Sequence, residues 1–388
     1  MMIYFYLSTA IFIVGMLIVY WLHNQYHLDI VVTPTSPPAK APLISVCVPA
    51  RNEQRNIRAC VESILVQDYP NFEIIVLEDR STDATGEILR GLAAENDKLR
   101  VINGSDLPKG WAGKPHALFQ AAATARGEWL CFVDADTFLS PATLSSCYAK
   151  AMETQADMFT IMTFQVMGSF WEKVVMPIVM TALSVGFSPR KVNDPKSEDA
   201  IANGQFILIK RSVYDAIGGH ESVKDQIVED KAISEQVKWN GYRLIVANGY
   251  SVAKTRMYTS FSEMWEGWTK NIYLGLSDRP SLMLLGAFGA FVLLVAALIL
   301  PLWPFLGGYW YVRGSGWVAL TVFIQSLFLW AIIIYARARV ATGMGIAPWY
   351  AFTFPLGSGV FAAMMFTSTW RVLSGKGVIW KGRIYTQK

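Results

Sequence analysis

The sequence predicts a water-facing α/β domain with membrane helices at both of its ends. Between residues 43 and 282, patterns of buried strands alternate with helical patterns, which is typical of βαβ units. Apolar runs long enough to cross a bilayer stand at the N-terminus and beyond residue 282. All 30 acidic residues lie between positions 23 and 282, and the eight Lys and Arg that follow have no acid among them.

The composition of the 388-residue chain excludes several classes of protein. Hydrophobic residues make up 53% and charged residues only 16%, against about a quarter charged in soluble domains. This excludes a disordered chain, a basic module with a nucleic-acid partner and an ordinary cytosolic enzyme. The four cysteines contain no C-x-x-C pair, so we expect neither a zinc site nor a disulfide framework: Cys47, Cys60, Cys131 and Cys147.

Residues 1–22 carry no charge, and we predict a retained N-terminal transmembrane anchor. The alternative is a cleaved signal peptide, which needs a basic start and a small-residue cleavage site. Neither is present, and Tyr20, Trp21 and His23 form the aromatic end typical of a retained helix. Residues 23–42 follow as a Pro-rich linker.

Residues 283–370 form the predicted C-terminal membrane region, with spans at 283–300 and 316–336. The segment 346–370 is uncharged, but it contains residues that break helices: Pro348, Pro355, Gly357 and Gly359. We predict a broken or re-entrant segment, because this keeps the basic tail 371–388 in the cytoplasm. An ordinary fourth span with an external tail is the alternative.

A shorter apolar run at 174–187 interrupts the predicted domain at 43–282, and it is too short to span a bilayer. Trp171, Lys173 and Arg190 flank it, which favours an interfacial helix on the membrane over a core helix.

The water-facing domain is predicted element by element. Strands, each ending in polar residues, and helices follow one another in this order: LISVCVPARNE (strand), NIRACVESILVQDY (helix), FEIIVLEDRSTDAT (strand), GEILRGLAAEN (helix), LRVIN (short strand), the loop DLPKGWAGKPH with a helix after it, and EWLCFVDADT (strand). We expect a parallel sheet whose ligands bind beyond the carboxyl ends of the strands. No G-x-G-x-x-G follows a strand, so a dinucleotide site is not expected.

Asp134 and Asp136 form a D-x-D motif at the end of a predicted strand. Two such carboxylates suit one hard divalent cation, Mg²⁺ or Mn²⁺, which prefers oxygen ligands. The ion would stabilise a diphosphate leaving group. A solvated loop is the alternative for a D-x-D taken alone.

Three further polar clusters are candidates for chemistry. Asp79 ends another strand, where its carboxylate suits the N–H of a uracil ring, although Ser81, Thr82 and Asp83 beside it also suit helix capping. Glu229 and Asp230 stand just before a helical pattern. One of these carboxylates could act as the general base for an acceptor hydroxyl, or both could simply stabilise the positive N-terminal end of the helix dipole.

Lys114 lies in a predicted glycine-rich loop and would meet phosphate as a point charge. For His116, two residues later, a surface or supporting role is favoured over that of a ligand.

The ordered motifs VPARNE, EDRSTD, VDAD and VED resemble those of the family 2 inverting glycosyltransferases with the GT-A fold. LPKGWAGKPHAL, NGQFILIKRSVYDAIGGH, EGWTKN and WKGRIY are similar to the membrane-bound branch of that family. The branch includes carotenoid-acid (diaponeurosporenoate), hopanoid-associated and ceramide glycosyltransferases. The resemblance covers about residues 43–275 and the tail.

The resemblance implies roles for particular residues. Five residues would hold the nucleotide: Pro49, Ala50, Arg51, Glu53 and Asp79. Asp134 and Asp136 would bind the metal and the diphosphate, and Asp230 would be the general base. Gly204 and Gln205 would border the acceptor and the sugar, with Trp268 and Lys270 near the membrane. Processive relatives carry Q-x-x-R-W, whereas Lys270 stands here in place of its arginine. This difference favours a single sugar transfer over polymerisation.

The sequence therefore predicts a multi-pass enzyme of the cell membrane with a cytoplasmic catalytic domain. It would move one sugar, a hexose of a UDP-sugar donor, to the hydroxyl or carboxyl group of a lipid with inversion at the anomeric carbon. The alternatives are a polysaccharide synthase and a non-catalytic scaffold or transporter subunit. Charges within the spans would mark a transporter, and the three clear spans, 1–22, 283–300 and 316–336, contain none.

Overall fold

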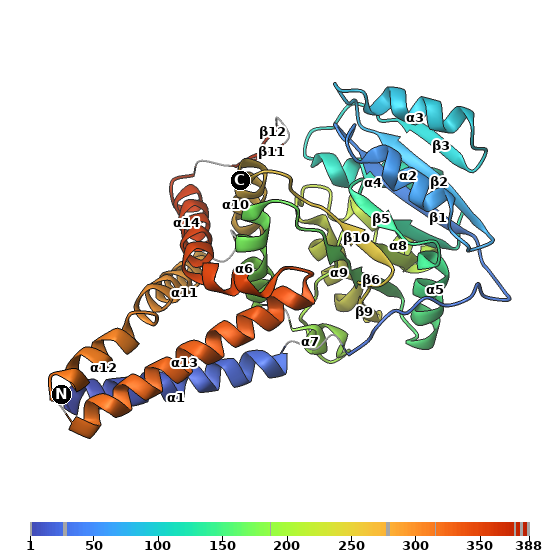
Figure 1. Cartoon of the computed structure of the whole chain (residues 1–388). Coiled ribbons are helices and arrows are strands. Elements are labelled where there is room, and N and C mark those ends of the chain that lie inside the picture. Colours follow the sequence, from blue (N-terminus) through green and yellow to red (C-terminus); the bar gives the residue numbers. More distant parts are fainter. Residues whose placement is uncertain are drawn as a thin grey trace. The chain divides into compact units, whose positions relative to one another are not determined.

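The computed structural model describes residues 2–25, 29–186, 188–276, 280–314, 316–375, 378–380 and 383–385. The chain divides into two compact units (Figure 1). The α/β unit contains residues 27–166 and 187–257, and the helical unit contains residues 1–26, 167–186 and 258–388. This division differs from the predicted domain at 43–282, because the helices at 170–186 and 261–276 pack against the C-terminal helices.

A mixed sheet of seven strands forms the centre of the α/β unit within the described residues, in the order β3-β2-β1-β4-β8-β6-β9. The strands are β1 (Ile44–Ala50), β2 (Phe72–Glu78), β3 (Leu99–Asn103), β4 (Trp129–Phe132), β6 (Met158–Met162), β8 (Ile207–Lys210) and β9 (Leu244–Asn248). The expectation of a wholly parallel sheet is wrong, since β8 runs antiparallel to β4 and β6. The chain leaves β6 at the carboxyl edge and returns to β8 at the same edge, which places residues 203–205 there.

Helices cover both faces of this sheet. One core is formed with α2 (Ile57–Leu65), α3 (Thr85–Ala94) and α5 (Thr143–Glu153), and the other with α4 (Gly113–Thr124), α8 (Arg211–Ala216) and α9 (Glu229–Trp239). The remaining elements of the unit are β5 (Thr137–Leu139), β7 (Phe164–Gln165), β10 (Ala253–Thr255), α7 (Pro189–Asn193) and η1 (Gly219–Glu221). The helix predicted at NIRACVESILVQDY is confirmed as α2, which buries Ile57, Cys60, Val61 and Ile64 on one face.

The helical unit contains long apolar helices. Its elements are α1 (Met2–Gln25), α6 (Phe170–Gly186), α10 (Phe261–Leu276), α11 (Pro280–Ile299), α12 (Trp303–Val312), α13 (Gly316–Gly343), η2 (Pro348–Thr353) and α14 (Phe354–Leu373). Among the described residues, three segments are long and apolar enough to cross a membrane: 283–312, 316–343 and 348–373. The N-terminal helix adds a shorter apolar stretch at Met2–Ile18.

The segment predicted as broken at 346–370 is a short 3-10 helix followed by the uninterrupted helix α14. Pro355 lies in the first turn of α14, where its missing N–H costs no hydrogen bond. Gly357 lies within the helix because of close packing: a Cβ there would stand 2.5 Å from the Val174 carbonyl oxygen of α6. The expectation that Gly357 and Gly359 interrupt the helix is therefore wrong, while the side of the membrane that holds the tail stays a prediction.

Two other predictions for the membrane region have no test in the structure. The run predicted at 174–187 lies in α6 up to Gly186, and its last residue is outside the described residues. Val174, Val175 and Ile178 of α6 are buried within the helical unit, and the place of the run at a membrane surface stays a prediction. In the basic tail 371–388, Lys376, Lys381 and Lys388 lie outside the described residues. Two short strands of the tail pair antiparallel, β11 (Val378–Trp380) with β12 (Arg383–Tyr385).

Candidate active site

A cluster of charged side chains lies at the carboxyl edge of the sheet, centred on Lys114. Lys114 Nζ lies 2.6 Å from Asp134 Oδ1, which follows β4, and 2.7 Å from Glu229 Oε1 in the first turn of α9. The predicted loop around Lys114 is wrong in one respect, since this residue lies in the first turn of α4. The structure thus brings together three residues from distant parts of the sequence.

Asp230 and Gly204 complete the cluster. The Gly204 N–H donates to Asp230 Oδ2 at 3.0 Å, and the Lys231 N–H donates to Asp230 Oδ1 at 2.8 Å. A Cβ on Gly204 would stand 3.0 Å from Lys114 Nζ, 3.2 Å from Asp230 Oδ2 and 3.5 Å from Asp134 Oδ2. The absence of a side chain at position 204 therefore leaves space where the charged groups converge.

The pKa values of Lys114 and Glu229 are both raised, for different reasons. Burial alone lowers the pKa of Lys114, but Asp134, Glu229 and Asp230 raise it well above its usual value. Burial raises the pKa of Glu229 to about 7, with Lys114 opposing this shift and Asp230 and Asp134 adding to it. Lys114 is therefore a permanent cation, and Glu229 is a buried carboxyl group that titrates near neutrality.

The D-x-D motif fits a divalent ion by the chemistry of its donors. The Asp134 carbonyl accepts the Thr137 N–H at 3.0 Å, a turn directly after β4. Burial raises the pKa of the Cys60 thiol, and the charges of Asp136, Asp134 and Glu53 raise it further. No set of three or more His, Cys, Asp and Glu side chains arranged to hold a metal occurs among the described residues. An ion at Asp134 and Asp136 would therefore take further ligands from a bound phosphate group and water.

The predicted nucleotide residues lie in the two loops that follow β1 and β2. Pro49 and Ala50 end β1, and the Ala50 carbonyl accepts the Asp79 N–H at 2.8 Å. Arg51 Nη1 donates to the Asp79 carbonyl at 2.8 Å and lies 3.8 Å from its Oδ2. The Glu53 N–H donates to Thr85 Oγ1 at 2.8 Å, which ties the first loop to α3. Contacts within the α/β unit thus gather all five of these residues.

The sequence did not identify the residues that connect these two loops. Asn52 and Arg80 both adopt positive φ, +55° and +53°, and Asn52 Oδ1 accepts the Thr82 N–H at 2.8 Å. The Asn52 N–H donates to Ser81 Oγ at 3.1 Å. Asp83, rather than Ser81 or Thr82, accepts the Thr85 N–H at the start of α3, at 3.0 Å. The capping alternative therefore applies to Asp83, and the buried Asp79 lies outside the helix start.

The remaining predicted residues lie around or apart from this cluster. Gln205 is buried, and its Oε1 accepts from Thr163 Oγ1, from Gln165 Nε2 at 3.0 Å and from Asn203 Nδ2 at 3.2 Å. His116 is also buried, with Nδ1 3.1 Å from Gln120 Nε2, so of its two predicted roles the surface one is wrong and the supporting one stays a prediction.

Trp268 and Lys270 lie on α10 of the helical unit, where the Trp268 indole N–H donates to Met176 Sδ at 3.2 Å. Trp268 is buried, so its indole ring packs inside that unit. The acceptor roles of Trp268 and Lys270 stay predictions.

A buried histidine behind the cluster was also not identified from the sequence as part of it. His220 in η1 has Nδ1 2.9 Å from the Tyr214 hydroxyl, and its ring stands edge-on to Phe132 at the end of β4. Burial and then the charge of Lys114 lower the pKa of His220 to about 3, so it is neutral. His220 ends the motif NGQFILIKRSVYDAIGGH, and this position was the one sequence signal that could have identified it as part of the site.

Comparison with known proteins shows similarity to glycosyltransferases. Residues 45–218 match the family model described as "Glycosyl transferase family 2". The 4,4'-diaponeurosporenoate glycosyltransferase of Staphylococcus aureus strain USA300 is 28% identical over 351 residues, which cover 88% of either chain. The protein of the same name from strain MRSA252 is 27% identical over 348 residues. The resemblance expected from the motifs is confirmed.

A solved structure is similar over almost the whole chain. It is a mannosyltransferase from Pyrobaculum calidifontis in complex with GDP-Man and Mn²⁺, with a TM-score of 0.56 and 18% sequence identity. The similarity covers 96% of this chain and 99% of that chain. Together with the mixed sheet, it confirms the predicted GT-A fold.

Proposed function

We propose that this chain is a hexosyltransferase that moves one sugar from a nucleotide-sugar donor, a UDP-hexose, to a lipid at the cytoplasmic face of the membrane. The match of residues 45–218 to the model "Glycosyl transferase family 2" supports this proposal. The observation that carries the proposal is the convergence of Lys114, Asp134, Glu229 and Asp230 around Gly204. The cluster provides a cation for the diphosphate and a carboxylate for the acceptor beside it.

The donor nucleotide would lie over the loops that follow β1 and β2. Asp79 would accept the N–H of the uracil ring, and Arg51 holds Asp79 through its backbone carbonyl at 2.8 Å. The diphosphate would lie toward Lys114, whose ammonium group is placed by two carboxylates and remains charged. A donor phosphate would replace Asp134 as one partner of this ammonium group while Glu229 keeps it in position.

A divalent ion fits this proposal. Asp134 and Asp136 would hold it, and it would supply charge stabilisation for the departing diphosphate. Support comes from the carboxylate donors of the D-x-D motif and from the Mn²⁺ named for the structurally similar mannosyltransferase.

Asp230 would act as the general base, and Glu229 would hold Lys114. Asp230 is half-buried, and its two oxygens accept backbone N–H groups that fix its orientation. Glu229 is 5% exposed, and its Oε1 is 2.7 Å from Lys114 Nζ, so an acceptor has less access to it. An acceptor hydroxyl at Asp230 would lose its proton as it attacks the anomeric carbon in line with the leaving diphosphate.

The lipid acceptor is supported by the apolar helices and by the name of the staphylococcal relatives, which act on diaponeurosporenoate. With the α/β unit in the cytoplasm, the spans at 283–300 and 316–336 place Arg337 and Arg339 on the inner side, in agreement with the positive-inside rule. Labelling of a Gln387→Cys variant in a cysteine-free background with an impermeant reagent tests the tail: labelling in intact cells would place it outside.

Mass spectrometry of lipids tests the whole proposal. Cells that express the chain should contain a lipid one hexose heavier than its precursor, and cells that express Asp230→Asn should lack it or contain much less. The same lipid profile in both would contradict the proposal, provided that both proteins reach the membrane in equal amounts. Growth of a soluble or cell-bound polysaccharide instead would indicate a polymerising synthase.

A further inference from the structure

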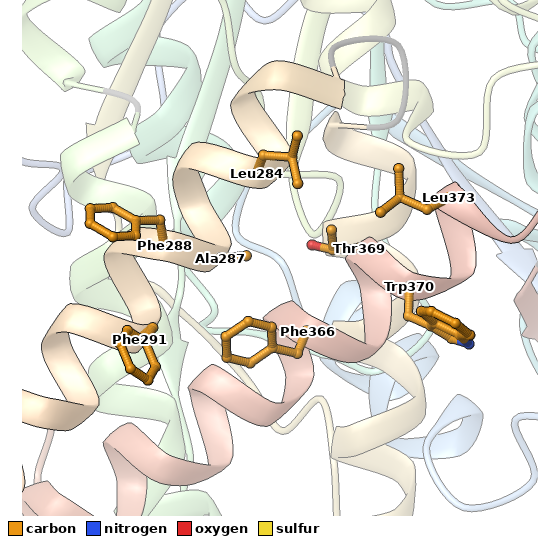
Figure 2. Close-up of a pocket in the computed structure, with 8 residues that line it drawn as sticks. All are labelled: Leu284, Ala287, Phe288, Phe291, Phe366, Thr369, Trp370 and Leu373. Carbon is orange, nitrogen blue, oxygen red and sulfur yellow. The ribbon is translucent and has the colours of Figure 1, made fainter.

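Most buried polar side chains of this protein have their hydrogen bonds completed by the protein itself. The pocket between α11 and α14 in the helical unit is one example, because its one hydroxyl group, that of Thr369, donates to the Met365 carbonyl at 2.8 Å within α14 (Figure 2). Gln67 in the α/β unit is another. Its Oε1 accepts the Leu144 N–H at 2.9 Å, and its Nε2 donates to two backbone carbonyls, at 2.9 and 2.7 Å. Groups of this kind need no ligand.

Gln205 is different from these groups. It is 5% exposed, and its Oε1 accepts three hydrogen bonds, from Thr163 Oγ1, from Gln165 Nε2 at 3.0 Å and from Asn203 Nδ2 at 3.2 Å. No residue that the structure describes accepts a hydrogen bond from its Nε2, and this atom is not sealed inside the core. An amide N–H that has lost water and gained no acceptor is costly, so the Gln205 amide indicates a partner from outside the chain.

The orientation of this carboxamide follows from backbone groups. Asn203 Nδ2 donates to the Ile161 carbonyl at 2.9 Å, and Asn203 Oδ1 accepts the Gln205 N–H at 3.3 Å. A backbone carbonyl only accepts and a backbone N–H only donates, so these contacts allow the Asn203 side chain a single orientation. Its Nδ2 must then face the oxygen of the Gln205 carboxamide, which leaves Gln205 Nε2 on the other side of that group.

One side of this network borders the charged cluster. Gly204 directly precedes Gln205, and its N–H donates to Asp230 Oδ2 at 3.0 Å. A Cβ on Gly204 would stand 3.0 Å from Lys114 Nζ, so position 204 lies beside both the cation and the proposed base. The hexose of a donor has to occupy this region, because it is bonded to the diphosphate and is attacked by the acceptor.

Another side of the network borders the D-x-D motif through a small sheet. Gln165 of β7 pairs with Thr255 of β10, which pairs in turn with Thr137 of β5. The Thr255 hydroxyl also donates to Thr137 Oγ1 at 3.3 Å, and Thr137 directly follows Asp136. Residues of the α/β unit alone therefore connect the proposed metal ligands to the Gln205 carboxamide.

We infer that Gln205 Nε2 donates a hydrogen bond to one hydroxyl group of the transferred hexose, and that Thr163 and Gln165 hold this carboxamide in position. The inference rests on the proposed function, because the hexose is that of the nucleotide-sugar donor. A neutral amide suits a neutral hydroxyl oxygen, whereas the diphosphate has the cation of Lys114. A donor that lacks this hydroxyl is selected against, because the buried amide is then left without a partner. Thr163 and Gln165 act on this selectivity through Gln205.

Calorimetric titration of the full chain in detergent with Mn²⁺ compares free UDP with UDP-glucose and UDP-galactose. The dissociation constant of UDP divided by that of the UDP-hexose isolates the contribution of the sugar, and binding of UDP itself reports a folded α/β unit. Gln205→Met keeps the length of the side chain and has no N–H donor. It should lower this ratio by roughly threefold to tenfold, with the affinity for UDP changed by less than about twofold.

Donors that lack a single hydroxyl group identify the contact. Wild type should bind one of the singly deoxygenated analogues of its preferred UDP-hexose roughly threefold to tenfold more weakly than the parent donor. Gln205→Met should bind that analogue and the parent equally, because the amide and the hydroxyl are two ends of one interaction. The other deoxygenated analogues should respond to Gln205→Met as the parent does.

Thr163→Val and Thr163→Ser test the positioning role. Valine has the shape of threonine but no hydroxyl donor for Gln205 Oε1, so the ratio should fall by roughly twofold to fivefold. Serine keeps the hydroxyl and should restore the ratio, which a role in packing alone does not predict. Thr163→Val also carries the test if Gln205→Met does not fold. Gln67→Met is the matched control, since it should lower the melting temperature and leave the ratio unchanged.

The outcomes separate this contact from the proposed function. An unchanged ratio in Gln205→Met, or an equal loss for the parent and every deoxygenated donor, would overturn the inference even if a lipid is glycosylated. An unchanged ratio in Thr163→Val would overturn the positioning role. If wild type binds no UDP-hexose more tightly than UDP, the proposed donor is wrong, and GDP-mannose with GDP replaces both in the same comparison. A selective loss in Gln205→Met without any glycosylated lipid in cells would contradict the proposed acceptor alone.

Discussion

Replacing Lys114 by Met removes the cation that two carboxylates share. Its Nζ lies 2.6 Å from Asp134 Oδ1 and 2.7 Å from Glu229 Oε1. The Asp134 side chain is 26% exposed, so loss of that contact costs at most about 1 kcal/mol. Glu229 is 5% exposed, and a buried carboxylate that loses its partner costs about 3–5 kcal/mol. Because Lys114 is itself 34% exposed, we expect the low end, about 3 kcal/mol in the free energy of unfolding.

Glu229→Gln tests the cause of that loss. Glutamine has no charge that needs Lys114, so the double variant should recover about 2 kcal/mol relative to the sum of the single variants. The pH dependence has a definite sign. Burial raises the pKa of Glu229 from 4.5 to about 7, so the folded chain keeps a proton that the unfolded chain has lost, and this contribution to stability falls as the pH rises between those values. Loss of Lys114 should cost more at about pH 8 than at about pH 6.

Melting of the full chain in detergent measures these effects. A loss of about 3 kcal/mol corresponds to roughly 6–12 °C for a unit of this size. Lys150→Met is the matched control, since Lys150 Nζ lies 2.6 Å from Glu153 Oε2, whose side chain is 66% exposed. It should cost less than about 1 kcal/mol. Equal melting of the two lysine variants, or additive losses in Lys114→Met with Glu229→Gln, would refute the reasoning.

Four further substitutions test the site. Asp230→Asn should lower turnover by roughly 10²–10⁴-fold with donor affinity little changed, and an equal loss of donor affinity in calorimetry would indicate a binding role instead. Asp136→Ala should remove most activity, as should EDTA on wild type, and near-normal turnover in either assay would contradict the metal assignment. Asp79→Ala should weaken the binding of free UDP in a titration and leave the melting temperature little changed. A lower melting temperature with unchanged UDP affinity would indicate a structural role. Gly204→Ala places a Cβ 3.0 Å from Lys114 Nζ and 3.2 Å from Asp230 Oδ2. We therefore expect sugar transfer to be up to about 10²-fold slower with the fold retained. Transfer at the wild-type rate would show that the reaction does not use this space.

The sequence predicted the separate elements of the α/β unit well, since each depends on a local pattern. The apolar runs that became β1, β2 and β4 are buried on both faces, and such runs are recognisable without knowledge of their neighbours. The acids of the site were identified for a similar reason, because Asp134 and Asp79 stand directly after such runs. The direction of β8 was not predictable in this way, because it depends on where a long excursion of the chain returns to the sheet.

The sequence by itself determined the strands, the helices, the long apolar runs and the acids at the strand ends, because short-range hydrophobic periodicity and charge placement encode them. The tertiary structure alone decided that Lys114 lies between Asp134 and Glu229, and that Glu229 is buried enough to titrate near neutrality. It also decided that Gly357 serves close packing against Val174 rather than a break in the helix. The physical reason is that pairing, burial and close approach depend on residues far apart in the chain, and a local pattern contains no information about them.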